Sequence, residues 1–418
     1  MKVRVARMIV EALLRRLRVG QVVIVEGARR RSFGSGQPIA VVEVRSPGFW
    51  TGLLRGSRGL AGTYMNAGWE SPDLPAVIEL CALNMPPLDR MRGWLAPLRL
   101  PWQALVGPLR RNTRLRSRRD ISAHYDLGND LFELMLDSTM MYSCALFETP
   151  ETPLEEAAVA KLEHICAKLE LSPADHVLEI GTGWGGFAVH AAGRHGCRVT
   201  TTTISQEQHD YAEARVRKAG LSDRVTVLLE DYRDLGGTYD KLVSIEMIEA
   251  VGWRDFSTFF TRCSGLLKPH GVMLLQAITI DDRAYEVEKA ARSFINTYIF
   301  PNGCLPSLKV ISRCVARCTD MRPVHLEDIT PHYTLTLRHW RRRFEANAVV
   351  AAERGYDERF QRLWKMYLSY CEGGFSARRI ADVHLVLAKP AYRGELGLIA
   401  RGERSAPGVA QGALDLAS

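Results

Sequence analysis

The sequence predicts an α/β protein whose larger domain is a doubly wound, mostly parallel β-sheet. Five short apolar runs lie between residues 177 and 277, and helical patterns separate them at the spacing typical of a parallel sheet. The stretch 176–188 (HVLEIGTGWGGFA) passes from a buried strand through a glycine cluster into the start of a helix. Such sheets bind ligands beyond the carboxyl ends of their strands, so we expect the functional site at that edge.

The elements of this domain follow from the alternation of apolar and polar residues. Helices are predicted over 157–169 and 206–219, where apolar residues recur at helical spacing. Two strands end in acidic residues, and these acids belong to the expected ligand edge. The predicted strands cover residues 177–180, 198–203, 225–229, 241–245 and 271–277.

The residues that precede this sheet predict a small α+β domain over 1–105. Residues 2–18 mix apolar side chains with lysine and arginine, which indicates a basic amphipathic helix. This helix either packs on its own domain or lies in a membrane interface, and the sequence favours neither. Strands over 21–26 and 39–44 and a helix over 74–83 complete the predicted domain.

Three further segments complete the predicted domain organisation. Residues 106–120 contain six arginines and form a predicted linker that also contacts anionic lipid. The α/β domain is expected to occupy 121–391, and its part from about 284 to 386 has a mainly helical pattern that predicts a cap over the sheet. The small, polar residues of 392–418 predict a flexible tail.

The distribution of charge predicts an anionic partner for the N-terminal part. Residues 1–120 contain 21 Lys/Arg and 8 Asp/Glu, an excess of 13 positive charges, whereas the remaining 298 residues have an excess of five negative charges. Nucleic acid and anionic phospholipid both fit such a charge. The arginine run has no interleaved aromatic residues, as a base-stacking groove would need, so we expect a membrane surface and no nucleic acid.

The remaining composition predicts where the protein works. No apolar run approaches the roughly 18 residues that span a bilayer, and no signal-peptide pattern is present. The nine cysteines are scattered, without paired metal-ligand spacing, which is typical of reduced thiols in the cytosol. We therefore expect a cytoplasmic protein that associates peripherally with the inner face of the membrane, and homo-oligomers remain possible.

The glycine cluster favours S-adenosylmethionine (SAM) over a nicotinamide cofactor. Gly181, Gly183 and Gly186 satisfy the dinucleotide pattern G-x-G-x-x-G. A nicotinamide site also needs an acid about 20 residues further on, at the end of the second strand. The segment 198–205 has no acid, whereas Glu179 lies inside the first strand, as in the first motif of SAM methyltransferases. The sequence therefore predicts a SAM site.

Several separated motifs together resemble the cyclopropane fatty acid synthase family, which includes the mycolic acid cyclopropane synthases. The resemblance is strong over about 120–386 and extends weakly to 62–69. This family transfers the SAM methyl group to a cis double bond of a lipid acyl chain, and loss of a proton then gives a cyclopropane ring or a methylene or methyl branch. The motifs are 123–130 (AHYDLGND), 141–145 (MYSCA), the glycine stretch, 246–252 (EMIEAVG) and 298–307 (YIFPNGCLPS).

The resemblance implies a set of SAM contacts in the class I methyltransferase fold. Tyr142 and Ser143 should touch the methionine end of SAM, and Asp231, Tyr232 and Arg233 should border the adenine. The other implied contacts come from the glycine loop and from the second strand and its helix. They are Glu179, Gly181, Thr182, Gly183, Trp184, Gly185, Thr203 and Gln208.

The resemblance also implies a bound bicarbonate ion as the base that removes the proton. Gln276 occupies the position of a family histidine, and Ala250 stands where a histidine often follows the glutamate. Glutamine donates a hydrogen bond but cannot become cationic, so this departure leaves both the base and the product open. Cys371 matches a cysteine proposed to be catalytic, although no base is evident beside it. The implied anion ligands are Cys144, Glu249, Tyr333, Gln276 and the backbone of Ile278.

These observations predict a SAM-dependent C-methyltransferase of unsaturated phospholipid acyl chains. The product is either a cyclopropane or a methylene or methyl branch, since Ala250 and Gln276 depart from the family pattern. A SAM methyltransferase of RNA or of a small molecule is an alternative, but it does not explain the motifs at 142–144 and 298–307. A non-catalytic lipid-binding relative would retain SAM and yield no product.

Overall fold

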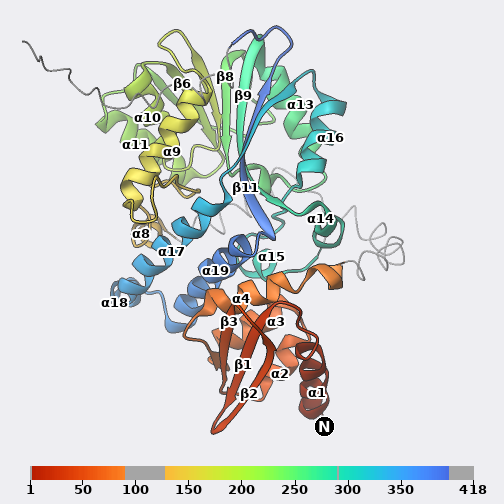
Figure 1. Ribbon diagram of the computed structural model, residues 1–418. Coiled ribbons are helices and arrows are strands. Elements are labelled where there is room, and N and C mark those ends of the chain that lie inside the picture. Colours follow the sequence, from red (N-terminus) through yellow and green to blue (C-terminus); the bar gives the residue numbers. More distant parts are fainter. Residues whose placement is uncertain (1, 90–127, 290, 395–418) are drawn as a thin grey trace, which may run out of the picture.

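The computed structural model describes residues 2–89, 128–289 and 291–394 (Figure 1). The predicted linker 106–120, the domain boundary at 105 and most of the predicted tail 392–418 lie outside the described residues. No helix in the described part of the chain is long and apolar enough to cross a membrane. The described residues form a small N-terminal domain below a larger α/β domain in the view of Figure 1.

The N-terminal domain is built on a four-stranded sheet with the strand order β2-β1-β3-β4. Its buried side chains, which include Val22, Ile24, Trp50 and Trp69, belong to an apolar core that continues into the larger domain. The predicted strands and the predicted helix 74–83 are present, and a further strand follows the first one. The elements are α1 (Lys2–Leu14), β1 (Gly20–Glu26), β2 (Arg29–Ser35), β3 (Ile39–Val44), α2 (Gly48–Leu53), α3 (Ser57–Met65), β4 (Trp69–Glu70) and α4 (Leu74–Leu83).

Helix α1 has apolar side chains on two faces. Ala6 and Val10 are buried against the domain, whereas Met8 is 65% exposed and Ile9 is 44% exposed. The Arg7 guanidinium lies 4.9 Å from the centre of the Trp50 ring and therefore fixes the helix to the domain. The helix thus packs on its own domain and still presents an apolar stripe to the solvent.

The larger domain contains a seven-stranded sheet with the strand order β10-β11-β9-β8-β5-β6-β7. Its strands from β9 to β7 are parallel, so the predicted doubly wound fold is confirmed. The strands are β5 (His176–Ile180), β6 (Arg198–Thr203), β7 (Val225–Leu229), β8 (Tyr239–Ile245), β9 (Leu267–Ile280), β10 (Arg322–Asp328) and β11 (Ile380–Ala388).

Helices cover both faces of this sheet (Figure 1). Alternate residues of a strand face opposite sides, so Val177 packs with the core of one face and Leu178 with the core of the other. The helices are α8 (Asn129–Glu133), α9 (Leu154–Lys168), α10 (Gly186–His195), α11 (Gln206–Lys218), α12 (Ile248–Val251), α13 (Phe256–Leu266), α14 (Asp282–Glu288), α15 (Phe294–Tyr298), α16 (Leu308–Cys318), α17 (Thr330–Ala346), α18 (Ala348–Glu353) and α19 (Glu358–Ser376).

The segment 284–386, which we predicted to be a helical cap, contains strands as well as helices. Strands β10 and β11 lie largely within it. Strand β11 pairs antiparallel with β9, and β10 pairs antiparallel with β11 at the edge of the sheet. The pattern of β11 is atypical of a buried strand, because Asp382 and His384 point into the interior. The helices α17 and α19 of this segment lie between the sheet and the N-terminal domain (Figure 1).

Helix α19 contacts the N-terminal domain through a position where a side chain does not fit. A Cβ atom added to Gly373 would lie 2.6 Å from the Pro75 carbonyl oxygen and 2.7 Å from the Glu79 amide nitrogen, both on α4. Both clashing atoms belong to backbone, so the two helices must separate to accept any larger residue. Gly373 therefore allows the two domains to approach closely.

We expect Gly373→Ala to destabilise the protein by about 1–3 kcal/mol through overpacking between α19 and α4. Gly265→Ala is the matched control, because a Cβ atom there meets nothing within 4 Å and alanine favours the helix. Urea unfolding of both variants measures the effect. Equal stability of the two variants would contradict the proposed close approach.

Candidate functional site

The glycine loop connects β5 to α10 at the carboxyl edge of the sheet. Gly181, Gly183 and Gly185 have φ angles of 105°, 51° and 79°, which favour glycine. The amides of Gly181 and Thr182 both donate to the Thr202 carbonyl oxygen at 3.0 Å, so β6 anchors the loop. A Cβ atom added to Gly183 would meet nothing within 4 Å, which leaves the backbone open to a ligand. This arrangement fits a cofactor that approaches bare backbone.

Two of the predicted SAM contacts lie beneath this loop. The Glu179 carboxylate accepts a 2.6 Å hydrogen bond from Thr201 Oγ1, and the Thr201 hydroxyl also contacts the Thr182 hydroxyl at 2.7 Å. Burial raises the pKa of Glu179 to about 8. Trp184 is buried and donates from Nε1 to Asn129 Oδ1 at 2.6 Å. In this structure, Glu179 and Trp184 therefore support the loop from the interior.

The predicted contacts after the second and third strands lie in two local hydrogen-bonded groups. Thr203 Oγ1 donates to Gln208 Oε1 at 2.8 Å, which fixes the start of α11 against the end of β6. The Asp231 carboxylate receives bonds of 2.8 and 2.6 Å from Arg233, and Tyr232 packs edge-on against a neighbouring ring. Acids and amides at these strand ends suit the polar parts of a nucleoside.

The remaining predicted SAM contacts, Tyr142 and Ser143, are held by residues that the sequence analysis missed. The Tyr142 hydroxyl lies 2.6 Å from the Tyr367 hydroxyl of α19. Ser143 Oγ accepts a 2.8 Å hydrogen bond from the Nζ atom of Lys161, which is fully buried on α9. Burial lowers the pKa of Lys161, while nearby carboxylates led by Glu246 oppose that shift. The sequence offered no signal for this lysine, because it lies within an ordinary helical pattern.

Glu246 is the centre of the predicted catalytic cluster, although the sequence analysis gave it no role. Its Oε1 atom accepts hydrogen bonds of 2.8 Å from the Cys144 amide and of 2.8 Å from Gln276 Nε2. Its Oε2 atom accepts a 2.5 Å hydrogen bond from the Tyr333 hydroxyl. Its backbone has a φ of 47°, which is uncommon for a residue other than glycine. The sequence signal that could have identified Glu246 is its position as an acid directly after β8.

Glu249 lies beside this cluster but has different partners. Its Oε1 atom accepts a 2.6 Å hydrogen bond from the Ile278 amide, and its Oε2 atom is buried without a hydrogen-bond partner. Burial, followed by the negative charge of Glu246, raises the pKa of Glu249 to about 8. Glu249 is therefore mostly protonated at neutral pH, so Glu246 is better suited to be the anion of the site.

The residues present do not fit an additional bicarbonate ion. Cys144, Gln276 and Tyr333 already donate to Glu246, and the predicted backbone donor at Ile278 already donates to Glu249. A second anion at this position would lack donors and would be repelled by the carboxylate. The predicted anion ligands thus converge on side chains of the protein itself.

Gln276 connects Glu246 to a second buried carboxyl group, Asp382. Gln276 Nε2 donates to Asp382 Oδ2 at 3.0 Å as well as to Glu246, so its Oε1 atom faces His384 Nε2 at 3.1 Å. His384 Nε2 must then carry the proton, and Nδ1 accepts from Lys168 Nζ at 3.0 Å. This chain fixes the orientation of the Gln276 amide and explains why glutamine suits the position.

The charge on Asp382 is suppressed. Burial and the proximity of Glu246 raise the pKa of Asp382 well above its usual value. Two carboxylates so close together in the interior cannot both ionise easily. Burial raises the pKa of Glu246 as well, but the hydrogen bonds from Tyr333 and the Cys144 amide and the charge of Lys161 oppose that shift. Of the two carboxyl groups, Glu246 is therefore better suited to hold the negative charge.

The two cysteines proposed for catalysis are both protonated thiols. The Cys144 thiol is buried and contacts the Ala145 carbonyl oxygen at 3.3 Å, and burial raises its pKa well above the usual value. Burial, followed by the charge of Glu246, raises the pKa of Cys371 to about 12. Neither thiol has the low pKa of a nucleophile, so Cys144 acts in the cluster through its backbone amide.

Aromatic rings surround the Glu246 carboxylate. The Tyr333 ring stacks on Phe375 with centroids 4.3 Å apart and meets Trp340 edge-on at 6.1 Å. Trp340 in turn lies 5.2 Å from the Tyr142 ring. Such rings exclude water and present π faces that stabilise a nearby cation.

Comparisons with known proteins identify the relatives of this chain. A family model described as mycolic acid cyclopropane synthetase matches residues 112–385. The tuberculostearic acid methyltransferase UfaA1 of Mycobacterium tuberculosis is 39% identical over 335 residues, which cover 77% of this chain and 77% of that protein. The cyclopropane-fatty-acyl-phospholipid synthase of Escherichia coli is 37% identical over 367 residues, which cover 86% and 91%.

A solved structure shows the same fold with a cofactor product bound. The mycolic acid cyclopropane synthase CmaA1, complexed with SAH and CTAB, has a TM-score of 0.61 and 31% sequence identity. The similarity covers 65% of this chain and 98% of that one. It supports the predicted class I methyltransferase fold and SAM as the cofactor.

The raised pKa of Glu249 predicts a pH-dependent stability. The folded protein retains a proton up to a pKa of about 8, whereas the unfolded chain releases it near the ordinary value of 4.5. Stability is therefore lost as the pH rises from 4.5 to 8 and is constant above that range.

Glu249→Gln removes the titrating carboxyl group. We therefore expect the stability of the variant, relative to that of the parent, to be higher at pH 8 than at pH 5.5. Chemical unfolding of both proteins at the two pH values measures it. Glu353→Gln serves as the control, because Glu353 is exposed. An identical pH dependence of parent and Glu249→Gln would show that Glu249 is already ionised when buried.

Proposed function

The chain belongs to the mycolic acid cyclopropane synthetase family and is a SAM-dependent methyltransferase, and we propose that it modifies the cis double bonds of phospholipid acyl chains. The named activities of its relatives in Escherichia coli and Mycobacterium tuberculosis support a lipid acyl substrate. The observation that carries the proposal furthest is the buried Glu246 carboxylate among aromatic side chains. An alkene-methylating enzyme requires such a base in a site that excludes water.

The cofactor would be held by the glycine loop and by the polar groups at the neighbouring strand ends. Gly183 leaves its backbone open, and Asp231 and Gln208 follow β7 and β6. When bound, SAM supplies an electrophilic methyl group. Ser143 and Lys161 add a polar contact near the catalytic cluster, where the methionine end is expected.

Glu246 would act as the base in place of a bound bicarbonate. Methylation of the double bond leaves a carbocation on the acyl chain, and loss of a proton neutralises it. Glu246 would accept this proton at a carboxylate oxygen, while the Cys144 amide, Gln276 and Tyr333 keep that oxygen in place. Because Asp382 is neutral, it does not compete for the proton.

Both products expected for this family fit this base. Ring closure and formation of a methylene branch each require removal of a proton from the acyl cation. The names of the two relatives describe different products, a cyclopropane acyl chain and tuberculostearic acid. Mass spectrometry of lipids from a host that expresses the chain tests the function, and fragmentation separates a ring from a branch. Unchanged lipids together with methylated RNA would favour the alternative substrate class.

The assignment of the base predicts a severe defect in Glu246→Gln. This change keeps the shape of the side chain but removes its charge, so we expect turnover to fall by about 100-fold or more. Affinity for SAH, measured by calorimetry, should be unchanged. Turnover at the parental rate would contradict the role of Glu246.

A rescue experiment distinguishes Glu246 from bicarbonate. Glu246→Gly leaves the three donors free, and glycine accepts the φ of 47°. Added bicarbonate or formate should restore part of its turnover and should have no effect on the parent or on Glu246→Gln. Loss of parental activity in carbonate-free buffer would mean that bicarbonate is the base after all.

Membrane association is the second part of this proposal, and the N-terminal domain would provide it. The predicted arginine contacts at 114–119 lie outside the described residues, so the support comes from α1 and β2. The exposed side chains of α1 include Met8, Ile9 and Leu13, and the exposed Arg15 and Arg16 follow the helix directly. A helix with exposed apolar residues flanked by arginines is suited to an anionic bilayer surface.

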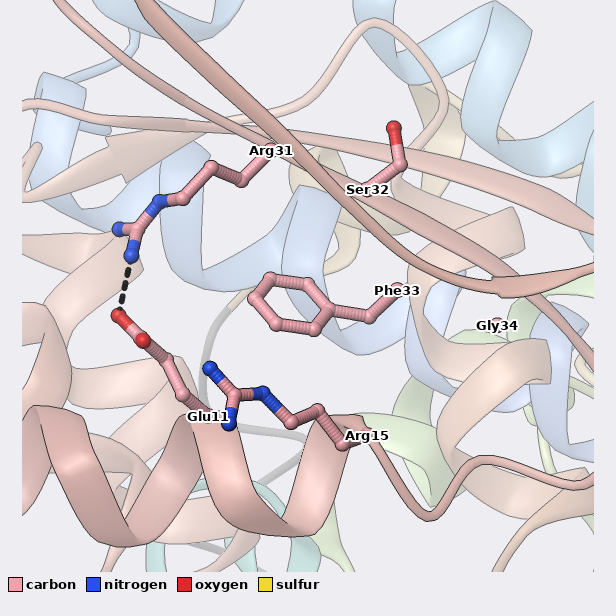
Figure 2. A pocket seen from close by; sticks show the side chains of 6 residues that line it. All are labelled: Glu11, Arg15, Arg31, Ser32, Phe33 and Gly34. Atoms are coloured by element: carbon pink, nitrogen blue, oxygen red, sulfur yellow. Dashed lines mark hydrogen bonds and ion pairs between the residues drawn. The ribbon is translucent and has the colours of Figure 1, made fainter.

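A cavity beside α1 offers a place for a lipid headgroup. Its volume is about 460 Å³, and Figure 2 shows Glu11 of α1, Arg15 just after α1, and Arg31 and Phe33 of β2 around it. Arg31 Nη1 donates to Glu11 at 2.5 Å, and its Nη2 atom makes no hydrogen bond but lies 3.6 Å from the Glu26 carboxylate. A phosphate group would satisfy that donor and the exposed guanidinium of Arg15.

We expect the protein to bind vesicles that contain anionic phospholipid and to bind neutral vesicles more weakly, with the difference lost at high salt. Arg15→Ala should weaken binding about fivefold, since one basic residue contributes about 1 kcal/mol. Met8→Ser should also weaken it, whereas the exposed Val349→Ser on α18 is a control that should not. Equal cosedimentation of all variants would contradict the assignment of α1.

A further inference from the structure

Helices α9 and α10 bring together four side chains that match the ligand preferences of zinc. Glu163 and Cys166 lie one helical turn apart on α9, and His190 and His195 lie on α10. The ligand atoms of Cys166, His190 and His195 all lie within 4.8 Å of one another. The Glu163 carboxylate lies 3.1 Å from His190 Nε2 and 3.1 Å from His195 Nε2. None of these residues has a role in the methyltransferase site.

The contacts within this group leave part of its hydrogen-bonding capacity unused. His190 Nε2 is buried without a hydrogen-bond partner, although the Glu163 carboxylate lies near it. This imidazole nitrogen is therefore available to a metal ion. A neutral imidazole is the form that binds a metal.

We propose that Glu163, Cys166, His190 and His195 form a structural zinc site that joins α9 to α10. Zinc binds thiolate, imidazole and carboxylate ligands with tetrahedral geometry, which separates ligand atoms by about 3.3–3.7 Å. The ligand atoms of Cys166, His190 and His195 now lie within 4.8 Å of one another and would have to draw together by about 1 Å to reach that geometry. Glu163 would complete the site from its position 3.1 Å from both imidazoles. One thiolate and one carboxylate would balance the charge of Zn²⁺.

A zinc ion can reach this site from the solvent, and the Cys166 thiol proton can leave it. The side chains of Glu163 and His195 are 37% and 24% exposed, so an ion can enter from the solvent. Cys166 is fully buried, and burial raises the pKa of its thiol. Zinc binding forms the Zn–S bond and releases the thiol proton to solvent, so affinity should increase with pH. Arg194, which donates to Glu163 at 3.3 Å and is largely exposed, would move away.

A second cluster in the described part of the chain does not share these properties. His164, Glu327 and His384 also bring ligand atoms together, but the Lys168 ammonium already donates to Glu327 and to His384. That cation satisfies the cluster without a metal. The zinc site would instead stabilise α10, whose first turn follows the glycine loop.

Metal titration of the full-length protein tests the site. After removal of metal by a chelator, Co²⁺ should bind in one equivalent with the absorption of a tetrahedral thiolate complex, and Zn²⁺ should displace it. Zinc should also raise the melting temperature of the parent. Cys166→Ser should lose the thiolate absorption, and Cys263→Ser, a buried cysteine on α13, is the matched control that should retain it.

His195→Asn is a second variant, chosen because that side chain is partly exposed and its loss should not unfold the protein. We expect at least a tenfold weaker affinity for Zn²⁺ in His195→Asn, with an unchanged circular dichroism spectrum. Failure of the parent to bind Co²⁺ or Zn²⁺ would overturn the proposal, as would equal binding by parent, Cys166→Ser and His195→Asn. These measurements do not use methyltransferase activity, so they stand apart from the proposed function.

Discussion

The structure of the catalytic region depends on the burial of one carboxylate, that of Glu246. Removing this charge from water is costly unless hydrogen bonds replace the lost hydration. The Cys144 amide, the Gln276 side chain and the Tyr333 hydroxyl supply those bonds, and they come from the loop before α9, from β9 and from α17. The Glu246 side chain thereby links segments that lie far apart in the sequence. Its carboxylate also occupies the place where the sequence analysis predicted a bound bicarbonate ion.

The surrounding network keeps that single charge in place. The Gln276 amide nitrogen donates to both Glu246 and Asp382, and the Gln276 amide oxygen accepts from His384. Burial keeps Asp382 and Glu249 largely neutral, so the site does not accumulate like charges. A neutral glutamine connects two carboxyl groups without adding a cation, whereas a charged histidine at the same position would pair with Glu246 and weaken it as a base.

Different parts of the fold contribute different groups to the site. The parallel part of the sheet offers its carboxyl edge to the cofactor, and β10 and β11 add the antiparallel edge from which Asp382 and His384 reach the site. Helix α19 joins this edge to the N-terminal domain, where close packing at Gly373 fixes their relative position. The exposed stripe of α1 then lies on the domain that packs against the catalytic one, so the proposed membrane contact would lie on the N-terminal domain.

The sequence by itself determined the parallel sheet, the glycine loop and the family motifs, because these depend on local periodicity and on residues close together in the chain. The second and third strands, at 198–203 and 225–229, have the predicted bounds for that reason. The tertiary structure alone decided the roles of Glu246, Asp382, His384 and Lys161, since each depends on partners more than a hundred residues away or on burial that no local pattern reveals. The same reason explains β11, whose polar interior residues hide its strand pattern until Gln276 and Lys168 are seen to satisfy them.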